Sequence, residues 1–509
     1  MPNSNYSIAS ALADFGIVIE ALTSNHLVND SRDVKENDIF CAVIGTALDG
    51  REYIEQAINN GAGLIIVQCQ LKKQHGTIIF KPSTILNNKV PVVQFYQLDQ
   101  SLFLLAQSYY QSPQKNMVTV GITGTNGKTS TAITLASLLT NCHKTTAVIG
   151  TVGAGVFPAV SPIDNTTPGA TEVFSLIERF AKQDAEYLAM EVSSHAIHQK
   201  RVLPELFDIA VFTNLSRDHL DYHESMAVYA DVKFSLFNSE RKQLAVINAD
   251  DEYAKDWLTG ETVVNKENLY LYGQRAEIKD LPSKGYVIAS EINHHQKGVS
   301  FTLKTHKGSC EISSPQLGDF NVDNLLAAIA VLISQDFSLD VIKSSIDILS
   351  PVIGRMETFH GENKPLAIVD YAHTPDGLKN ALKAAKQHCS GELWLVFGCG
   401  GDRDKGKRPE MGAIAEQYAD HVIVTNDNPR TEAPEMIVSG ILSGCKKSER
   451  MTIILERAQA VKSVFAHAKP DDCILFAGKG HEEYVVIGTK KSPYNERELV
   501  KAYYEEAIL

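Results

Sequence analysis

The chain has 509 residues, enough for roughly three domains of ordinary size. Hydrophobic residues make up 44% and charged residues 21%, which excludes a mostly disordered, collagen-like or coiled-coil chain. The net charge of −13 provides no overall field that attracts a nucleic-acid backbone, so we expect no nucleic-acid partner.

The cysteines and the apolar segments indicate a cytoplasmic protein. The eight cysteines are scattered, with no C-x-x-C pair and no zinc-finger spacing, as expected for reduced thiols. The first twenty residues lack a basic stretch followed by an apolar one, and the longest apolar run, 325–333, is too short to span a bilayer. We therefore expect neither an export signal nor a membrane anchor.

The first segment, residues 1–98, has the texture of a small α/β domain. Short β-rich stretches at 38–45 and 62–69 alternate with a helix-like stretch at 52–62. No internal repeat or low-complexity tract interrupts this segment or the rest of the chain.

Two longer segments, residues 99–351 and 352–509, alternate strands with amphipathic helices. The expected strands lie at 118–123, 187–192, 209–214 and 244–248, and at 366–370, 393–397, 422–425 and 473–477. This alternation is typical of mostly parallel sheets, and the predicted fold class is α/β. Ligands of such sheets bind at the carboxyl ends of the strands, so the residues that follow each strand are the candidates for a site.

A glycine-rich loop follows the strand expected at 118–123. It consists of Gly124, Thr125, Asn126, Gly127, Lys128 and Thr129, and the helix after it has apolar positions at Ala132, Leu135, Ala136 and Leu139. The backbone N–H groups of such a loop bind phosphate oxygens, Lys128 supplies a positive charge, and Thr129 supplies a hydroxyl for Mg²⁺.

The loop departs from the usual phosphate-loop spacing. The glycine expected five residues before Gly127 is replaced by Ile122, with Gly121 and Gly124 on either side. A glycine-rich turn without a ligand is the alternative interpretation. The Gly-Lys-Thr triplet lies where a strand passes into a helix, and this position favours a phosphate loop.

Two residues near strand ends are candidates for a second metal ion. Glu191 lies at the end of the strand expected at 187–192, where a carboxylate can reach a metal ion or a water bound to it. A polar strand end with ordinary partners is the plainer interpretation of this glutamate. His219 follows the strand expected at 209–214, but imidazole is an unusual ligand of Mg²⁺, so residue chemistry alone argues against a ligand role.

Lys233 lies on the apolar side of an expected helix. By helical spacing it shares a face with Tyr229, Val232, Leu236 and Phe237. Its aliphatic stem can simply pack on this face while the ammonium reaches water. Alternatively, burial lowers its pKa and leaves a neutral amine that takes up CO₂ as a carbamate, whose new anion can meet a cation.

A series of motifs extends over the whole chain in a characteristic order. They are GITGTNGKT, MEVSSH, NLSRDHLDYH, YADVKFSLF, LGDFNVDNLLAA, GRME, DYAHTPD, GCGGDRDKGKRP, DNPR and AGKGHE. In this order the chain resembles the Mur ligases, which build the peptide of the bacterial cell wall.

The resemblance implies three domains and a reaction. The domains are a UDP-binding α/β domain (1–98), a central P-loop ATPase-type domain with a parallel sheet (99–351) and a Rossmann-like amino-acid-binding domain (352–509). The implied enzyme is a monomeric ATP-dependent amide ligase that adds meso-2,6-diaminopimelate to the D-glutamate of UDP-N-acetylmuramoyl-L-alanyl-D-glutamate. ATP phosphorylates the D-glutamate side-chain carboxylate, and the amine then attacks the acyl phosphate and expels phosphate. Two Mg²⁺ ions and Lys128 neutralise charge in both steps.

The resemblance also assigns residues to ATP and to the metal ions. Lys128 and Thr129 are expected to hold the phosphates and the first Mg²⁺, and Glu191 and His219 to serve a second Mg²⁺. Lys233 corresponds to the carbamylated lysine of the family. Further ATP contacts are implied for Asn321, Asn324, Arg355, His373 and Asp376. For His219, the resemblance reverses the expectation from its chemistry alone.

The other two substrates are assigned in the same way. Ser31 and Arg32 are implied to hold UDP, and the muramoyl dipeptide is expected at Thr166, Thr167, Ser193, Gln199 and Arg201. The amino-acid pocket is expected to consist of Arg403, Asp427, Asn428, Arg430, Gly478 and Glu482.

Four other functions were weighed against this one. A folylpolyglutamate synthetase lacks the first domain with its NDSRD run. An L-lysine-adding ligase is disfavoured by Arg430, whose guanidinium repels an ammonium and suits a second carboxylate. A nucleotide-binding regulator without turnover needs none of Glu191, His219 and Lys233. A nicotinamide-dependent dehydrogenase is disfavoured because Arg403 stands where the third glycine of G-x-G-x-x-G is required.

Overall fold

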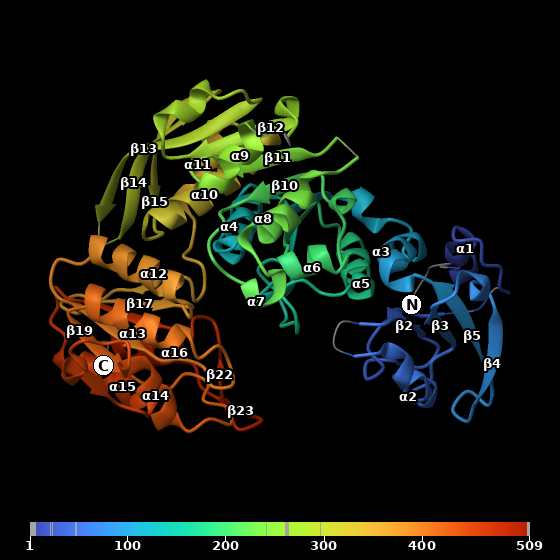
Figure 1. The fold of residues 1–509 in the computed structure, drawn as a ribbon. Coiled ribbons are helices and arrows are strands. Elements are labelled where there is room, and N and C mark those ends of the chain that lie inside the picture. Colours follow the sequence, from blue (N-terminus) through green and yellow to red (C-terminus); the bar gives the residue numbers. More distant parts are fainter. Residues whose placement is uncertain are drawn as a thin grey trace. The chain divides into compact units, whose positions relative to one another are not determined.

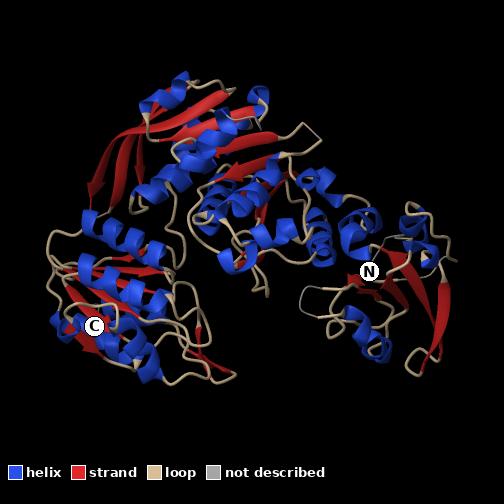
Figure 2. Ribbon diagram, viewed as in Figure 1, coloured by secondary structure: helices blue, strands red, loops and turns tan. Residues whose placement is uncertain are grey.

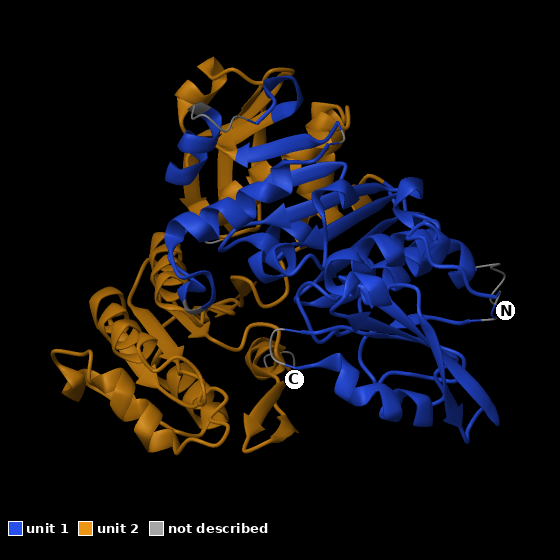
Figure 3. Cartoon of the chain, turned by 45° about the vertical axis from the view of Figure 1, so that its right-hand side comes forward, with its two compact units in different colours: residues 1–132, 143–247, 251–269 blue, residues 133–142, 248–250, 270–509 orange. Residues whose placement is uncertain are grey.

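The computed structural model describes residues 7–20, 22, 24–45, 48–240, 242–259, 264–295 and 297–505. The chain divides into two compact units, one made of residues 1–132, 143–247 and 251–269 and the other of residues 133–142, 248–250 and 270–509 (Figure 3). Part of the N-terminal segment considered above for export, residues 1–6, lies outside the described residues.

The first unit begins with a small five-stranded sheet. Its strands are β1 (Leu27–Val28), β2 (Ile39–Ala42), β3 (Leu64–Cys69), β4 (Ile78–Ser83) and β5 (Asn88–Tyr96), in the order β1-β2-β3-β5-β4. Only β4 runs antiparallel to its neighbour. Helices cover both faces of this sheet: α1 (Ile8–Ala13) and α3 (Leu98–Tyr109) on one face, and α2 (Ile54–Asn59) on the other (Figure 1). Because successive side chains of a strand point to opposite faces, Ile39 of β2 packs in the first core and Phe40 in the second. The expected strands and helix of this segment are confirmed.

The remaining strands of the first unit form the order β11-β10-β6-β9-β7-β8. They are β6 (Val118–Thr123), β7 (Thr146–Gly150), β8 (Gly153–Val156), β9 (Tyr187–Glu191), β10 (Ile209–Phe212) and β11 (Leu244–Asn248). All pairs are parallel except β7 with β8. The helices are α4 (Lys128–Asn141), whose residues from 133 on are grouped with the second unit, α5 (Ala170–Ala181), α6 (Ser194–His198), α7 (Leu220–His223), α8 (Met226–Phe234) and α9 (Glu252–Thr259). The four apolar positions expected on the helix after the glycine loop are at most 1% exposed, which confirms that face.

The second unit contains three antiparallel strands that the alternation of strands and helices did not predict. Strand β12 (Leu269–Gly273) pairs parallel with β13 (Gly285–His295), and β13, β14 (Gly298–Thr305) and β15 (Gly308–Ser314) follow as an antiparallel meander. Gly298 and Gly308 begin β14 and β15 with φ of +138° and +140°, a region that a side chain disfavours. Helices α10 (Asp319–Ser334) and α11 (Leu339–Asp347) follow.

The C-terminal part of this unit is a six-stranded sheet covered on both faces. Its order is β16-β17-β21-β18-β19-β20, and only β16 is antiparallel. The strands are β16 (Glu357–Phe359), β17 (Leu366–Asp370), β18 (Leu393–Phe397), β19 (His421–Val424), β20 (Met451–Ile453) and β21 (Cys473–Ala477), with a separate hairpin of β22 (Tyr484–Ile487) and β23 (Lys490–Pro493).

Helices on the two faces of this sheet belong to separate cores (Figure 2). One core joins Leu475 of β21 to α12 (Pro375–Gln387), α13 (Lys407–Tyr418) and α14 (Pro434–Leu442). The other joins Phe476 to α15 (Arg457–His467) and α16 (Glu496–Glu505). This arrangement is that of a doubly covered α/β sheet, as predicted. Across the described part of the chain, every helix is too short or too polar to span a bilayer.

Candidate active site

The glycine loop lies between β6 and α4, as its sequence predicts. Gly124 and Gly127 have φ of +150° and +85°, and a Cβ on Gly124 would lie 1.9 Å from Thr213 Oγ1. The backbone is held from the end of β10: Thr213 Oγ1 donates to Asn126 O (2.6 Å), and Thr125 N donates to Asn214 O (2.8 Å). Two glycines are therefore required here by conformation and by close packing.

Lys128 folds back over this loop. Its Nζ donates to the carbonyl oxygens of Gly124 and Thr125, both at 2.8 Å. Its positive charge therefore lies at the N-terminus of α4, where the helix dipole already favours an anion. The loop, the dipole and the ammonium together form a phosphate-binding arrangement.

Glu191 and Thr129 meet beside the loop. Glu191 is 1% exposed, and its Oε2 accepts from Thr129 Oγ1 (2.9 Å) and from Thr151 Oγ1 (3.2 Å). Its Oε1 accepts from Thr151 N (2.8 Å), and a Cβ on Gly150 would lie 2.3 Å from this oxygen. Sequence reasoning missed Thr151 and Gly150, because only pairing of β7 with β9 brings them to Glu191.

The hydroxyl of Thr129 and the carboxylate of Glu191 fit a Mg²⁺ site. Both are hard oxygen donors, which Mg²⁺ prefers, and they lie at hydrogen-bond distance from each other next to the phosphate loop. Among the described residues, no three side chains of His, Cys, Asp or Glu gather in a metal-binding cluster. A magnesium ion here would accordingly take few protein ligands and share phosphate oxygens, which is its usual mode of binding.

Lys233 is buried, as its place on the helix predicts. Its side chain on α8 is 1% exposed, and its Nζ lies 4.6 Å from the centre of the Tyr229 ring. The Nζ donates to Gly124 O (2.8 Å), the same oxygen that accepts from Lys128. Burial, followed by the Lys128 charge, lowers the pKa of Lys233 well below its ordinary value. The structure thus confirms the expected burial of this lysine.

His219 belongs to a cluster of rings next to α8. It lies just before α7 with φ of +53°, and its ring centre is 4.9 Å from that of His195 and 6.2 Å from that of Tyr229. The Nε2 of His219 lies 3.5 Å from Asp218 Oδ2. The ring of Tyr229 also contacts Lys233, which donates to Gly124 O in the glycine loop. His219 is thus linked to the glycine loop through Tyr229 and Lys233.

The five residues expected to hold the muramoyl dipeptide form one hydrogen-bond network. Thr167 Oγ1 donates to Glu191 O (2.8 Å) and accepts from Ser193 N (3.0 Å). Arg201 donates to Thr167 O (3.2 Å) and to Gln199 Oε1 (2.5 Å). The hydroxyl of Thr166 lies 3.1 Å from that of Thr151. Sequence positions up to 35 residues apart are thus brought to the end of β9, beside Glu191.

The two residues expected to hold UDP lie in the part of the first unit that contains the five-stranded sheet. Ser31 is buried and donates through Oγ to Gln56 Oε1 (2.9 Å). Arg32 has a side chain that is 79% exposed and pairs with its neighbour Asp30. A cation with this exposure can turn toward a diphosphate at little cost, because surface ion pairs are weak.

The other residues expected to contact ATP belong to the second unit. Asn321 and Asn324 lie in the first turns of α10, both 4% exposed, and Asn324 Nδ2 donates to Asn321 Oδ1 (3.0 Å). Farther along the chain, the Arg355 guanidinium lies 4.6 Å from the centre of the Tyr371 ring, and His373 Nδ1 lies 2.8 Å from Tyr371 O.

Asp376 lies in the first turn of α12, the helix that Thr374 caps through its hydroxyl. The residues expected at ATP in the C-terminal part therefore collect at the carboxyl end of β17.

The residues predicted for the amino-acid pocket come from loops at the carboxyl ends of β18, β19 and β21. Asn428 Nδ2 donates to Glu482 Oε2 (3.0 Å), and a Cβ on Gly478 (φ +110°) would lie 3.3 Å from Asp427 Oδ2. Arg430 Nη1 donates to Gly401 O (2.8 Å). Arg403 is exposed on the loop after β18. The structure brings Asp427, Asn428, Gly478 and Glu482 into contact.

Lys479 is the central cation of this group, and sequence reasoning missed it. Its side chain is 0% exposed, and its Nζ donates to Asn428 Oδ1 (2.8 Å), Glu482 Oε2 (3.1 Å) and the carbonyl of Tyr484 (3.0 Å). Asp427 Oδ1 lies 3.1 Å from the same nitrogen. The signal was present in the AGKGHE motif, where Lys479 lies between two residues that were selected.

Lys479→Met is expected to lower the free energy of unfolding by about 3–5 kcal/mol, because it leaves the buried Asp427 carboxylate and the partly buried Glu482 carboxylate without their cation. Urea denaturation at neutral pH measures this change. Lys490→Met, at an exposed position of β23, is the control and should leave the midpoint unchanged. A loss below about 1 kcal/mol for Lys479→Met would contradict the role assigned to this ammonium.

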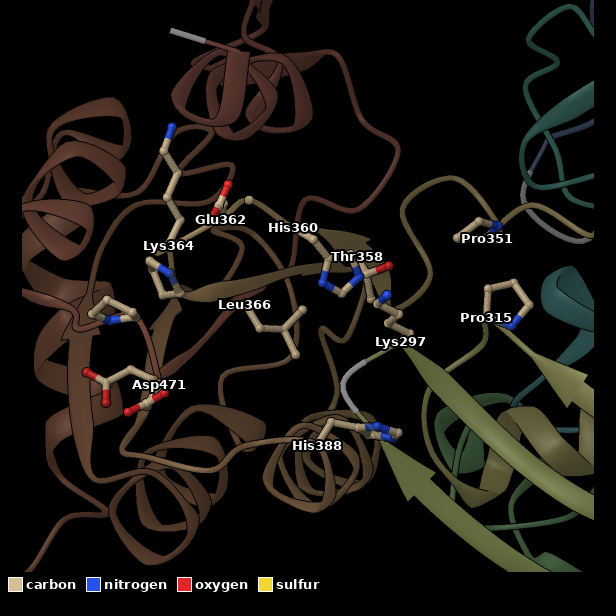
Figure 4. Close-up of a pocket in the computed structure, with 14 residues that line it drawn as sticks. Lys297, Pro315, Pro351, Thr358, His360, Glu362, Lys364, Leu366, His388 and Asp471 are labelled. Carbon is tan, nitrogen blue, oxygen red and sulfur yellow. The ribbon is translucent and has the colours of Figure 1, made fainter. Parts of the chain in front are cut away.

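A pocket of about 680 Å³ lies elsewhere in the second unit (Figure 4). It is lined by polar residues such as Lys297, His360 and Asp471 and by several prolines. None of the residues selected from the sequence lines it, and β17 contributes its first residue, Leu366, at the end opposite to Asp370. This pocket is therefore distinct from the strand ends where the predicted site residues collect.

Comparisons with known proteins identify the family of the chain. Three family models match: "Mur ligase family, catalytic domain" over residues 24–110, "Mur ligase middle domain" over 122–332 and "Mur ligase, glutamate ligase domain" over 354–480. A UDP-N-acetylmuramoyl-L-alanyl-D-glutamate--2,6-diaminopimelate ligase of Haemophilus influenzae (strain 86-028NP) is 42% identical over 475 residues, 93% of this chain and 95% of that protein.

Solved structures give the same result. A structure of a UDP-N-acetylmuramoyl-L-alanyl-D-glutamate--2,6-diaminopimelate ligase covers 98% of this chain and 99% of its own, with 32% identity and a TM-score of 0.65. The UDP-N-acetylmuramoylalanyl-D-glutamyl-2,6-diaminopimelate--D-alanyl-D-alanyl ligase of Acinetobacter baumannii shares the fold, at 17% identity and a TM-score of 0.63 over 98% of this chain and 97% of its own. The match in sequence and in fold extends over nearly the whole chain, and the chain belongs to the Mur ligase family.

Proposed function

We propose that this chain is an ATP-dependent ligase that joins meso-2,6-diaminopimelate to the D-glutamate side-chain carboxyl of UDP-N-acetylmuramoyl-L-alanyl-D-glutamate. The observation that carries the proposal is 42% identity with the Haemophilus influenzae ligase over 93% of the chain. The reaction forms an amide, ADP and phosphate, and it serves peptidoglycan synthesis.

Residues of the first unit bind ATP and the dipeptide, so that the D-glutamate carboxylate can be phosphorylated. The glycine loop and Lys128 bind the phosphates of ATP and stabilise charge on the phosphoryl group while it moves to the D-glutamate carboxylate. Thr167, Ser193 and Arg201 form the network beside Glu191 and position the muramoyl dipeptide. This proximity of acceptor and phosphate supplies a large part of the rate acceleration.

Thr129 would hold the first Mg²⁺, Glu191 and His219 would hold the second, and a carbamate on Lys233 would be a further ligand. A bound Mg²⁺ supplies neutralisation of the phosphate charges. The support from this structure is the 2.9 Å separation of the Thr129 hydroxyl and the Glu191 carboxylate. Asn321, Asn324, Arg355, His373 and Asp376 are proposed to complete the contacts to ATP, and Ser31 and Arg32 those to UDP.

The second unit binds the amino acid. Arg430 is proposed to hold the distal carboxylate of diaminopimelate, with Arg403 as a second donor, because a guanidinium and a carboxylate form two parallel hydrogen bonds. The other proposed pocket residues are Asp427, Asn428, Gly478 and Glu482. Lys479 balances the negative charge of Asp427 and Glu482. The acidic groups suit the ammonium groups of the amino acid.

The organisation of the protein is proposed to follow the substrates. A UDP-binding domain covers residues 1–98, an ATP-binding domain 99–351 and an amino-acid-binding domain 352–509. We also propose that the protein acts as a monomer in the cytoplasm, with neither a membrane anchor nor a nucleic-acid partner.

Phosphate release from ATP is expected only when UDP-N-acetylmuramoyl-dipeptide and the amino acid are both present, because acyl transfer completes the reaction. A panel that includes meso-diaminopimelate, L-lysine and L-ornithine, measured by phosphate release and by product mass, tests this expectation. Release that does not depend on the amino acid would identify an ATPase or a regulator. Preference for L-lysine would retain the ligase and reject the substrate.

A further inference from the structure

Arg457 is a buried cation that none of the roles above uses. It is 5% exposed and occupies the first position of α15, where the helix dipole disfavours a positive charge. Its place there is therefore not explained by the stability of the helix. The explanation lies in what the guanidinium contacts.

The guanidinium binds one carboxylate and two backbone carbonyls. Its Nε and Nη2 donate to Glu496 at 2.5 and 2.8 Å, and Glu496 is 0% exposed and also accepts from Tyr494 Oη (2.9 Å). Nη2 donates in addition to Ala477 O (2.8 Å), and Nη1 donates to Asn426 O (3.1 Å). Glu496 thus neutralises the charge, and the remaining donors hold main-chain oxygens.

These two carbonyls lie where the two loops of the proposed amino-acid pocket begin. Asn426 directly precedes Asp427, and Ala477 directly precedes Gly478. The strands that carry the loops, β19 and β21, are not neighbours, because β18 lies between them. No ladder of backbone hydrogen bonds joins β19 to β21, and the guanidinium spans this separation with a single rigid group.

We propose that Arg457 is a positioning residue, which holds the loops at 426–430 and 477–482 at the spacing that the amino-acid substrate requires. The inference rests on the proposed function, since it takes these loops as the amino-acid pocket. Arginine suits this task because its donors have a fixed planar geometry, whereas a lysine ammonium at the same place reaches Glu496 and one carbonyl but not both.

Arg457→Met and Arg457→Lys test the proposal by steady-state kinetics of all three substrates. We expect the KM of the amino acid to rise about tenfold or more in Arg457→Met and less in Arg457→Lys, because charged hydrogen bonds to each loop are lost in turn. The KM values of ATP and of the UDP-dipeptide should change less than twofold. An unchanged amino-acid KM in a folded Arg457→Met protein would overturn the proposal.

Hydrogen exchange provides a second measurement that does not depend on activity. In Arg457→Lys, amides of residues 426–430 and 478–482 should exchange at least several-fold faster than in the wild type, while amides of β18 stay protected. Unchanged exchange in both loops would overturn the proposal, and it remains decisive where Arg457→Met does not fold. Arg497→Met is the matched control, because Arg497 forms a similar two-point pair with Glu357 and donates to neither loop.

The design separates this inference from the function beneath it. If the wild type accepts L-lysine instead of diaminopimelate, the substrate proposal fails, and the KM of L-lysine should rise in Arg457→Met. If the wild type has no ligase activity, the proposed function fails and the exchange measurement still decides whether Arg457 holds the two loops.

Discussion

Lys233→Ala is expected to reduce kcat by about 100- to 1000-fold, with partial rescue by formate or acetate. The Lys233 amine lies 2.8 Å from Gly124 O in the phosphate loop, in a site that is closed to water. A carbamate at this position places a negative charge where phosphate-bound cations need one, and alanine removes it. A short carboxylic acid that enters the space left by the side chain restores part of that charge.

The chemistry of the site favours formation of the carbamate. CO₂ reacts with the neutral amine, and burial together with the Lys128 charge lowers the pKa of Lys233, which favours the neutral form. Carbamylation should accordingly increase as the pH rises through the lowered pKa and decrease below it. Removal of CO₂ from the buffer should reduce wild-type activity, and bicarbonate should restore it.

Lys255→Ala is the control, because Lys255 is an exposed lysine on α9 that pairs with Glu252. It should retain full activity with or without CO₂. If Lys233→Ala is as active as the wild type in CO₂-depleted buffer, the carbamate has no role in the reaction. If it is inactive but bicarbonate has no effect on the wild type, the lysine acts as an amine.

Arg430→Ala is expected to raise the KM of meso-diaminopimelate about 30-fold to several thousand-fold, which corresponds to roughly 2–5 kcal/mol. The main chain of Arg430 is pinned by hydrogen bonds from its N to Val486 O (3.0 Å) and from Gly488 N to its O (2.8 Å). On the side chain, Nη1 donates to Gly401 O (2.8 Å). The guanidinium is thus held in place from one side, as a preorganised carboxylate receptor requires.

The measurement is a comparison of three KM values. Those of ATP and of the UDP-dipeptide should stay within about twofold of the wild type, because Arg430 belongs to neither of their sites. Lys405→Ala, at an exposed lysine 3.5 Å from Glu432, is the control on the same side of the fold. An unaltered diaminopimelate KM in Arg430→Ala would show that this arginine does not recognise the third residue.

Local patterns predicted a large part of the site. The glycine loop, its helix and the strand ends could be predicted from short stretches of sequence, because the spacing of hydrophobic residues and the position of turn residues are local signals. The burial of Lys233 followed from the same helical period. Glu191 was identified from its place on β9, although its partner Thr151 was not.

Long-range pairing limited the rest of the prediction. The meander of β13, β14 and β15 depends on contacts between strands, and alternation of polar and apolar residues within one strand does not reveal its partner. Lys479 and Arg457 were missed because their carboxylates and carbonyls come from other strands and helices. In the sequence, each of these residues resembles an ordinary surface cation. Only the folded structure shows that several loops supply hydrogen-bond acceptors around it.

The closed position of Lys233 also determines how its modification can be detected. A carbamate returns to amine and CO₂ when it is protonated, and unfolding exposes it to water. Intact-mass or peptide measurements in acidic solvent will therefore report the unmodified chain of 55.9 kDa whatever the state of the native enzyme. Carbon-13 spectroscopy of the folded protein in labelled bicarbonate at neutral pH observes the carboxyl carbon directly, and Lys233→Ala supplies its blank.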